Sequence, residues 1–145
     1  MTAREYQFLK SCVAQYGLLY LWGGKGFPAE PYRGRDCSGF VTAALMAAGG
    51  PDLRANYNAQ RMWTEWKPTD LIQPGTVALY GSAGDQVSHA MASLWNGAVI
   101  GSRGGDREVD TPEEAIERKA GVGIRRSHLY RRDFLGWRRL PWVDG

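Results

Sequence analysis

The hydrophobic pattern of this chain changes once along its length, and the change indicates the fold class. In the first part, apolar residues recur at helical spacing and predict a helix over residues 3–16, which ends at Gly17. From Ile72 onward, apolar and polar residues alternate as they do in half-buried strands. Helices followed by an antiparallel meander predict an α+β fold, in which the N-terminal helices pack on one face of a curved sheet of about five strands.

The remaining elements are predicted from the same periodicity and from turn residues. Gly49-Gly50-Pro51 ends a second helix, Thr111 caps a later one, and Asn96-Gly97 predicts a two-residue hairpin. The segment Lys25–Arg35 holds prolines and glycines and is expected to be a loop. After the first helix, the expected helices are 37–48, 59–66 and 112–120, and the expected strands are 76–80, 87–95, 98–102, 122–130 and 134–142.

Length and composition bound the class of protein. The 145 residues suit one compact domain, residues 1–145, and no stretch is apolar over the length that a membrane span needs. The first residues form an amphipathic pattern without the apolar centre of a signal peptide, so we expect the protein to be made in the cytoplasm. Residues 121–145 carry six arginines against two aspartates, which suits an anionic polymer such as cell wall or nucleic acid. A solvated face of two strands would give the same count, and the sequence leaves both interpretations open.

The most informative short segment is Asp36-Cys37-Ser38-Gly39, which opens the apolar second helix. Asp36 is a capping residue type, and Cys37 follows at the first helical position, where the helix end favours a thiolate. An arbitrary cysteine is more often an inert core residue. Here the polar, glycine-rich flanks indicate an exposed thiol, and Gly39 is expected to let a substrate backbone approach. Cys37 is therefore the candidate nucleophile.

The candidate base is His89, which lies on an expected strand beside small neighbours that leave its ring accessible. Imidazole can take the thiol proton and later protonate the leaving amine. The other histidine, His128, lies in the arginine-rich segment and is expected at a surface or a sheet edge. Cys12 is expected in the core; a disulfide between Cys12 and Cys37 stays open, although it would consume the nucleophile. No zinc-ligand spacing and no phosphate-binding glycine loop is present, so neither a metal nor a cofactor is expected.

Several of these segments together resemble the NlpC/P60 cysteine peptidases. The motifs are YLWGG at residues 20–24, DCSGFV at residues 36–41, LIQPGTVALY at residues 71–80, and Ser88-His89 ahead of Asn96-Gly97. The resemblance implies a papain-like α+β core and cleavage of peptide bonds in bacterial peptidoglycan stems, commonly the bond between D-γ-glutamate and a diamino acid. It implies Cys37 as nucleophile and His89 as base, and Tyr20, Trp22, Asp36 and Ser38 as residues that line the site and hold the amino end of the substrate or the oxyanion.

One position departs from the family pattern. Twelve residues after the base, where the family has a polar residue that orients the imidazole, this chain has Gly101. A two-residue hairpin at Asn96-Gly97 would place Ser102 on the face of His89, so Ser102 is the expected third member of the site. A backbone carbonyl, a water molecule or Asp106 are the alternatives, and a bulge would change the register.

The small size, the lack of a signal peptide and the tail at residues 130–137 resemble bacteriophage members of the family. The resemblance implies a lysin that reaches the wall through a holin pore, or a virion protein that contacts other phage tail proteins; a monomer is expected. The alternatives are an amidase or acyltransferase on the same fold, and a catalytically silent wall-binding or tail module. Five tryptophans expected to be exposed favour the silent module: Trp63, Trp66, Trp95, Trp137 and Trp142. No recognition-helix pattern supports nucleic-acid binding, so no nucleic-acid partner is expected.

Overall fold

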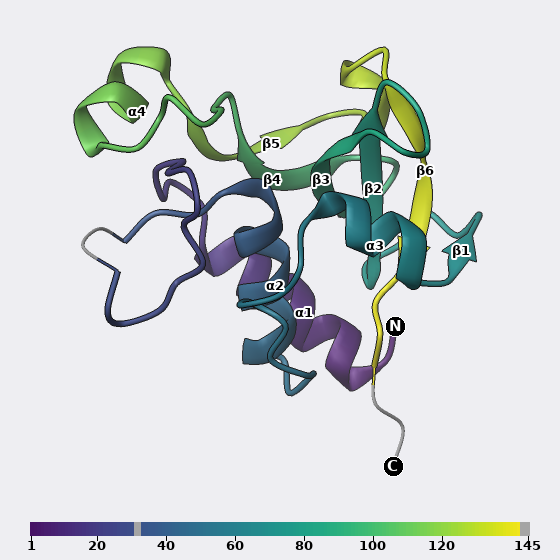
Figure 1. The fold of residues 1–145 in the computed structure, drawn as a ribbon. Helices are drawn as coiled ribbons and strands as arrows, with labels where there is room; N and C mark the ends of the chain where they lie inside the picture. Colours follow the sequence, from purple (N-terminus) through teal and green to yellow (C-terminus); the bar gives the residue numbers. More distant parts are fainter. Residues whose placement is uncertain (31–32, 143–145) are drawn as a thin grey trace.

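The computed structural model describes residues 1–30 and 33–142 (Figure 1). Its helices are α1 (Ala3–Ala14), α2 (Cys37–Ala47), α3 (Ala59–Glu65) and α4 (Pro112–Arg118), and a 3-10 helix covers His128–Tyr130. Its strands are β1 (Pro68–Thr69), β2 (Thr76–Gly81), β3 (Val87–Ser93), β4 (Val99–Arg103), β5 (Gly121–Arg125) and β6 (Phe134–Arg139). The strands form one antiparallel sheet in the order β1-β6-β2-β3-β4-β5.

The predicted α+β fold is confirmed. In Figure 1, α1 and α2 lie together beside the sheet; α2 packs on β3 and β4, and α3 packs on β3. The main core cluster joins α1, α2 and α3 to this face of the sheet through buried residues such as Phe8, Phe40, Met62 and Leu79. Its Cys12 is buried as expected, and both cysteines are free thiols. This shared core therefore holds α2 against β3 and β4.

The opposite face of the sheet carries a second apolar cluster. Tyr80, Met91 and Trp137 are buried there, and Tyr130 and Phe134 pack against them from the segment before β6. The ring of His128 joins this cluster, 4.7 Å from the ring centroid of Phe134. His128 therefore lies in a half-buried 3-10 turn and not at a sheet edge, which was one of the two positions expected from the sequence.

Two features of the sheet differ from the sequence prediction by more than a shift of one to three residues at the end of an element. The sheet has six strands because the short segment Pro68–Thr69 pairs with Trp137 and Arg138 of β6. The strand expected over 122–130 ends at Arg125, because the hydroxyl of Ser127 accepts the Leu129 N–H at 3.0 Å and caps the 3-10 helix. Two residues of the expected Lys25–Arg35 loop, 31 and 32, lie outside the described residues.

The register of the β3–β4 hairpin also differs by one residue. Asn96 and Gly97 adopt the expected positive φ angles, +57° and +80°, and the Ala98 N–H donates to the Trp95 carbonyl at 3.1 Å. The Ala98 carbonyl, however, accepts from Leu94 N–H at 2.8 Å, so the first arm carries one extra residue. The strands consequently pair Ala92 with Ile100. A shift of one residue turns every side chain to the other face of a strand.

Within the described residues, no helix is both long and apolar enough to cross a membrane.

Candidate active site

Cys37 and His89 line the same cavity, which has a volume of about 600 Å³. Cys37 is the first residue of α2, and His89 lies on β3. All four residues expected to bind substrate line it too: Tyr20, Trp22, Asp36 and Ser38. The structure therefore brings together the predicted nucleophile, the predicted base and the predicted substrate-binding residues, whereas Ser102 is not part of this cavity lining.

The cap of α2 positions the thiol. The Asp36 carboxylate accepts the Gly39 N–H at 2.6 Å, which fixes the first turn of the helix. A Cβ atom on Gly39 would collide with the Gly24 carbonyl oxygen, so glycine is needed here for packing between two parts of the chain. This differs from the expected reason, which was access for a substrate backbone.

A β-bulge brings β3 to the thiol. The pairing of β2 with β3 shifts between Tyr80 and Gly81, so Ser88 has no partner in the register. The Cys37 Sγ lies 3.7 Å from the Ser88 carbonyl oxygen, to which it donates. The bulge thus places the residue before the candidate base next to the candidate nucleophile.

The environment of Cys37 favours the thiol over the thiolate. Burial, and then the nearby Asp36 carboxylate, raise the pKa of Cys37 to about 11, although Lys25 and backbone N–H groups act in the opposite direction. The thiolate that the helix end was expected to favour is therefore not the resting form at neutral pH. Desolvation outweighs the helix end at this position.

The imidazole of His89 is neutral in the same way. Burial, and then the positive charges of Arg131 and Arg103, lower the pKa of His89 to about 3, while Asp133 opposes this shift. Its side chain is 6% exposed, and its ring centroid lies 5.4 Å from that of Tyr80. The resting pair is thus a neutral thiol and a neutral imidazole, and a proton must move when the sulfur attacks.

The hydrogen-bond partner of the imidazole is Tyr130. The His89 Nε2 and the Tyr130 hydroxyl oxygen are 2.9 Å apart. Tyr130 comes from the 3-10 helix, on the sheet face where His89, Tyr80 and Phe134 gather. No sequence motif marks this residue, because its contact with His89 depends on the path of the chain after β5.

Ser102 does not take the place expected for it. It is fully buried, and its hydroxyl donates to the Arg35 carbonyl at 2.6 Å. The register of the β3–β4 hairpin turns Ser102 to the helix-covered face, where its partner on β5 is Val122. Asp106, the alternative, lines the cavity, but its carboxylate pairs with Arg118 at 3.1 Å. The orienting role predicted for Ser102 is wrong for this register.

Lys25 is a site residue that the sequence analysis missed. Its Nζ lies 2.9 Å from each Asp36 carboxylate oxygen and 2.6 Å from the Ser38 hydroxyl. It also lines the cavity. Only its place directly after the YLWGG motif, at the start of the expected loop Lys25–Arg35, marked it as a residue near the site.

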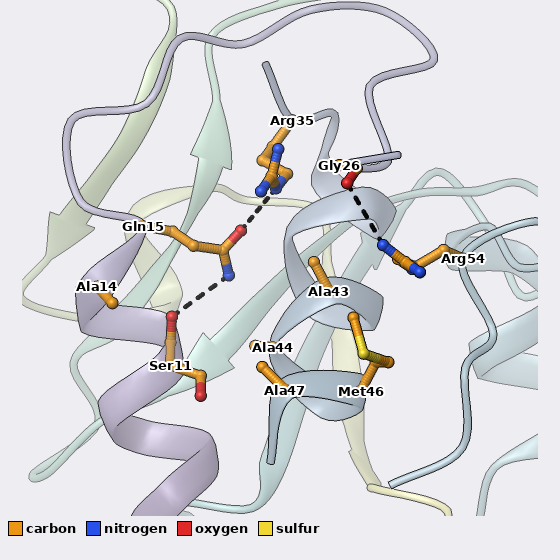
Figure 2. Close-up of a pocket in the computed structure, with 10 residues that line it drawn as sticks. All are labelled: Ser11, Ala14, Gln15, Gly26, Arg35, Ala43, Ala44, Met46, Ala47 and Arg54. Atoms are coloured by element: carbon orange, nitrogen blue, oxygen red, sulfur yellow. Dashed lines mark hydrogen bonds between the residues drawn. The ribbon is translucent and has the colours of Figure 1, made fainter. Parts of the chain in front are cut away.

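A smaller cavity of about 270 Å³ lies behind α2, between α1 and the loop before α2 (Figure 2). The Arg35 Nε donates to the Gln15 side-chain oxygen at 2.9 Å, and Arg54 donates to the Gly26 carbonyl at 3.4 Å. These bonds tie the loop before α2 to the C-cap of α1 and to the connector between α2 and α3. Within the described part of the chain, no group of three His, Cys, Asp or Glu side chains is placed to hold a metal ion.

Comparisons with known proteins agree with the fold described above. The fold is similar to an NlpC/P60 family protein of Bacillus cereus, with 20% identity, a TM-score of 0.69, and coverage of 93% of this chain and 39% of that protein. It is similar to the P60 domain of an antigen from Mycobacterium avium subspecies paratuberculosis, with 20% identity, a TM-score of 0.62, and coverage of 94% and 93%. It is also similar to RipD of Mycobacterium tuberculosis, described as a non-catalytic domain adapted to peptidoglycan binding, with 14% identity, a TM-score of 0.65, and coverage of 97% and 99%.

At these identities the likeness shows the fold alone. No curated protein matches the sequence. The model of the NlpC/P60 family, whose members are generally cysteine peptidases that act on peptidoglycan, matches residues 17–126, well over half of the chain. This protein therefore belongs to the NlpC/P60 family.

Proposed function

We propose that this protein is a cysteine hydrolase that cuts an amide bond in the stem peptides of bacterial peptidoglycan. The observation that carries the proposal is the convergence of Cys37 and His89 on one cavity, at the N-terminus of α2. Membership of the family supports the substrate class. The proposed bond joins D-γ-glutamate to a diamino acid, as the resemblance of the sequence motifs implies.

In the proposed mechanism, the Cys37 sulfur attacks the carbonyl carbon while His89 takes the thiol proton. Because both groups are neutral at rest, the proton moves as the carbon–sulfur bond forms. The Gly39 N–H is already used by Asp36, so we assign the oxyanion to the N–H groups of Cys37 and Ser38. His89 then protonates the leaving amine as the carbon–nitrogen bond breaks. Water hydrolyses the thioester, giving its proton to His89, and the thiol is restored.

The proposed setting is a bacteriophage, either as a lysin released through a holin or as a tail-associated wall hydrolase. This rests on the segment at residues 130–137, which resembles phage members of the family. We propose a monomer that is made in the host cytoplasm and acts on the wall.

The test is mass spectrometry of purified peptidoglycan digested with the wild-type protein, Cys37→Ala and His89→Ala. New stem fragments from the wild type alone are expected, and their masses identify the bond. Cys12→Ala is the matched control, because Cys12 is a buried thiol outside the cavity, and it should retain activity. Activity in Cys37→Ala equal to the wild type would exclude the mechanism.

A second candidate function is a silent wall-binding module. The raised pKa of Cys37 and the lowered pKa of His89 favour it, since neither group is ionised in advance. Of the tryptophans expected to be exposed, Trp66 and Trp137 are buried in the core, Trp63 and Trp142 are half-buried, and Trp95 is 52% exposed, so the surface that they offer to such a module is smaller than expected. If the wild type pellets with the wall and releases no fragments, this function replaces the hydrolase.

A further inference from the structure

A complete binding site for an ammonium group lies beside the candidate nucleophile. An ammonium group has three N–H donors. Those of Lys25 reach both carboxylate oxygens of Asp36, each at 2.9 Å, and the Ser38 hydroxyl at 2.6 Å. Asp36 and Ser38 flank Cys37 in the sequence and line the catalytic cavity with it. The chain therefore fills this site with its own side chain.

The backbone of Lys25 is held in place. Its N–H donates to both carboxylate oxygens of Glu30, at 2.8 and 3.0 Å, and the residue forms a β-bridge with Arg35. The neighbouring Gly26 carbonyl accepts from Arg54, and Arg35 is tied to Gln15, as Figure 2 shows. Lys25 is thus delivered to Asp36 by a loop that is anchored on both sides, and little ordering is required for the ion pair to form.

The ion pair is also shielded from solvent. The side chains of Lys25 and Asp36 are 18% and 12% exposed, so salt and water weaken their attraction less than at an open surface. Removing one partner of such a pair leaves a charge without compensation, which is costly. An incoming ammonium group competes with a group of the same chain that is already in position. An ammonium group that entered without displacing Lys25 would be repelled by the positive charge of Lys25.

We propose that Lys25 selects against substrates with a free amino end. The Asp36–Ser38 site is closed to an external ammonium, and the protein acts on stem peptides whose amino end is blocked as an amide. Such stems remain joined to the rest of the wall. This inference rests on the proposed hydrolase function and names its substrate class.

The test compares two stem peptides that are identical except for a free or an acetylated amino end. The wild type is expected to cleave the acetylated peptide with at least tenfold higher kcat/KM. Lys25→Met removes the charge at similar length and should lose or reverse that preference. Lys25→Arg keeps the charge and should retain it, which separates the effect from misfolding. Lys10→Met, an exposed lysine of α1, is the matched control and should behave as the wild type.

Calorimetry on Cys37→Ala repeats the comparison as binding, so that the proposal does not depend on turnover. If the wild type cleaves both peptides equally or prefers the free amine, the hydrolase stands and the Lys25 inference is wrong. If no peptide is cleaved, but Cys37→Ala binds the acetylated peptide at least tenfold more tightly and Lys25→Met in that background removes the difference, the hydrolase is wrong and the inference stands. Absence of both cleavage and binding overturns both.

Discussion

Replacing Tyr130 by phenylalanine removes the tyrosine hydroxyl that contacts both the candidate base and the Arg131 side chain. The change removes the group that lies 2.9 Å from His89 Nε2. It keeps the ring, which packs at 5.7 Å from the ring of Tyr80. The fold and the apolar cluster around it should therefore be preserved, so a loss of activity would report on the hydrogen bond.

The expected magnitude follows from the charge that His89 carries during the reaction. A hydrogen bond between neutral groups contributes about 0.5–1.5 kcal/mol, and one to a charged group about 1.5–3 kcal/mol. At rest the imidazole is neutral, and it becomes positive when it takes the thiol proton. The bond therefore strengthens by about 1–1.5 kcal/mol in the transition state, which corresponds to roughly a tenfold loss of kcat in Tyr130→Phe.

The assay is steady-state cleavage of an acetylated stem peptide, with kcat and KM measured separately across pH. A positioning role predicts a lower kcat with little change in KM, because Tyr130 acts through His89. Tyr57→Phe is the matched control, since its hydroxyl bonds to Glu65 outside the cavity at 2.9 Å. An unchanged kcat in Tyr130→Phe at every pH would refute the reasoning.

Three further predictions follow from burial and hydrogen bonding. Alkylation of Cys37 by iodoacetamide should rise with pH towards a midpoint near 11, with buried Cys12 unlabelled; a midpoint at or below 8 would contradict the burial argument. Folding lowers the pKa of His89 from 6.5 to about 3, so between these values the unfolded chain binds a proton that the folded chain does not. The unfolding free energy is therefore unaffected by this proton above pH 6.5 and decreases as the pH falls towards 3. Urea unfolding between pH 7 and 4 should show this slope, and His89→Gln should flatten it. Ser102→Ala should lower the unfolding free energy by about 0.5–1.5 kcal/mol, because one hydrogen bond to the Arg35 carbonyl is lost while the Leu21 N–H still donates to it, and should leave kcat unchanged.

Much of the fold was predictable because local patterns and packing agree. The helical spacing of apolar residues before Ile72 and the alternation after it correspond to α1–α3 and to the sheet. The cap at Asp36 was predictable from residue type, and its carboxylate accepts the N–H of Gly39. Such signals act within a few residues, so a single sequence contains them.

The residue that contacts the imidazole of His89 was not predictable, because this contact depends on segments that are distant in the sequence. The turn at Asn96-Gly97 forms as expected, but one extra residue before it changes which face Ser102 occupies. Turn residues alone do not show this bulge. The contact of Tyr130 with His89 joins positions 41 residues apart, and it depends on where β5 ends.

The protonation state of Cys37 was also not predictable from neighbouring residues in the sequence. A helix N-terminus favours a thiolate, and this is visible in the sequence. The competing desolvation depends on segments distant in the sequence that pack beside the half-buried Cys37, including the bulge at Ser88. Lys25 likewise reaches Asp36 only because its loop is anchored by Glu30.

The second apolar cluster has a consequence for the order in which the protein is made. Cys37 and its helix leave the ribosome before Tyr130 and Phe134, which pack on the sheet face around His89. A nascent chain that ends before this segment holds the nucleophile and the base without the partner of the imidazole. Competence for the proposed reaction would therefore arise only after this segment is made, and products of translation interrupted before it would be poor hydrolases.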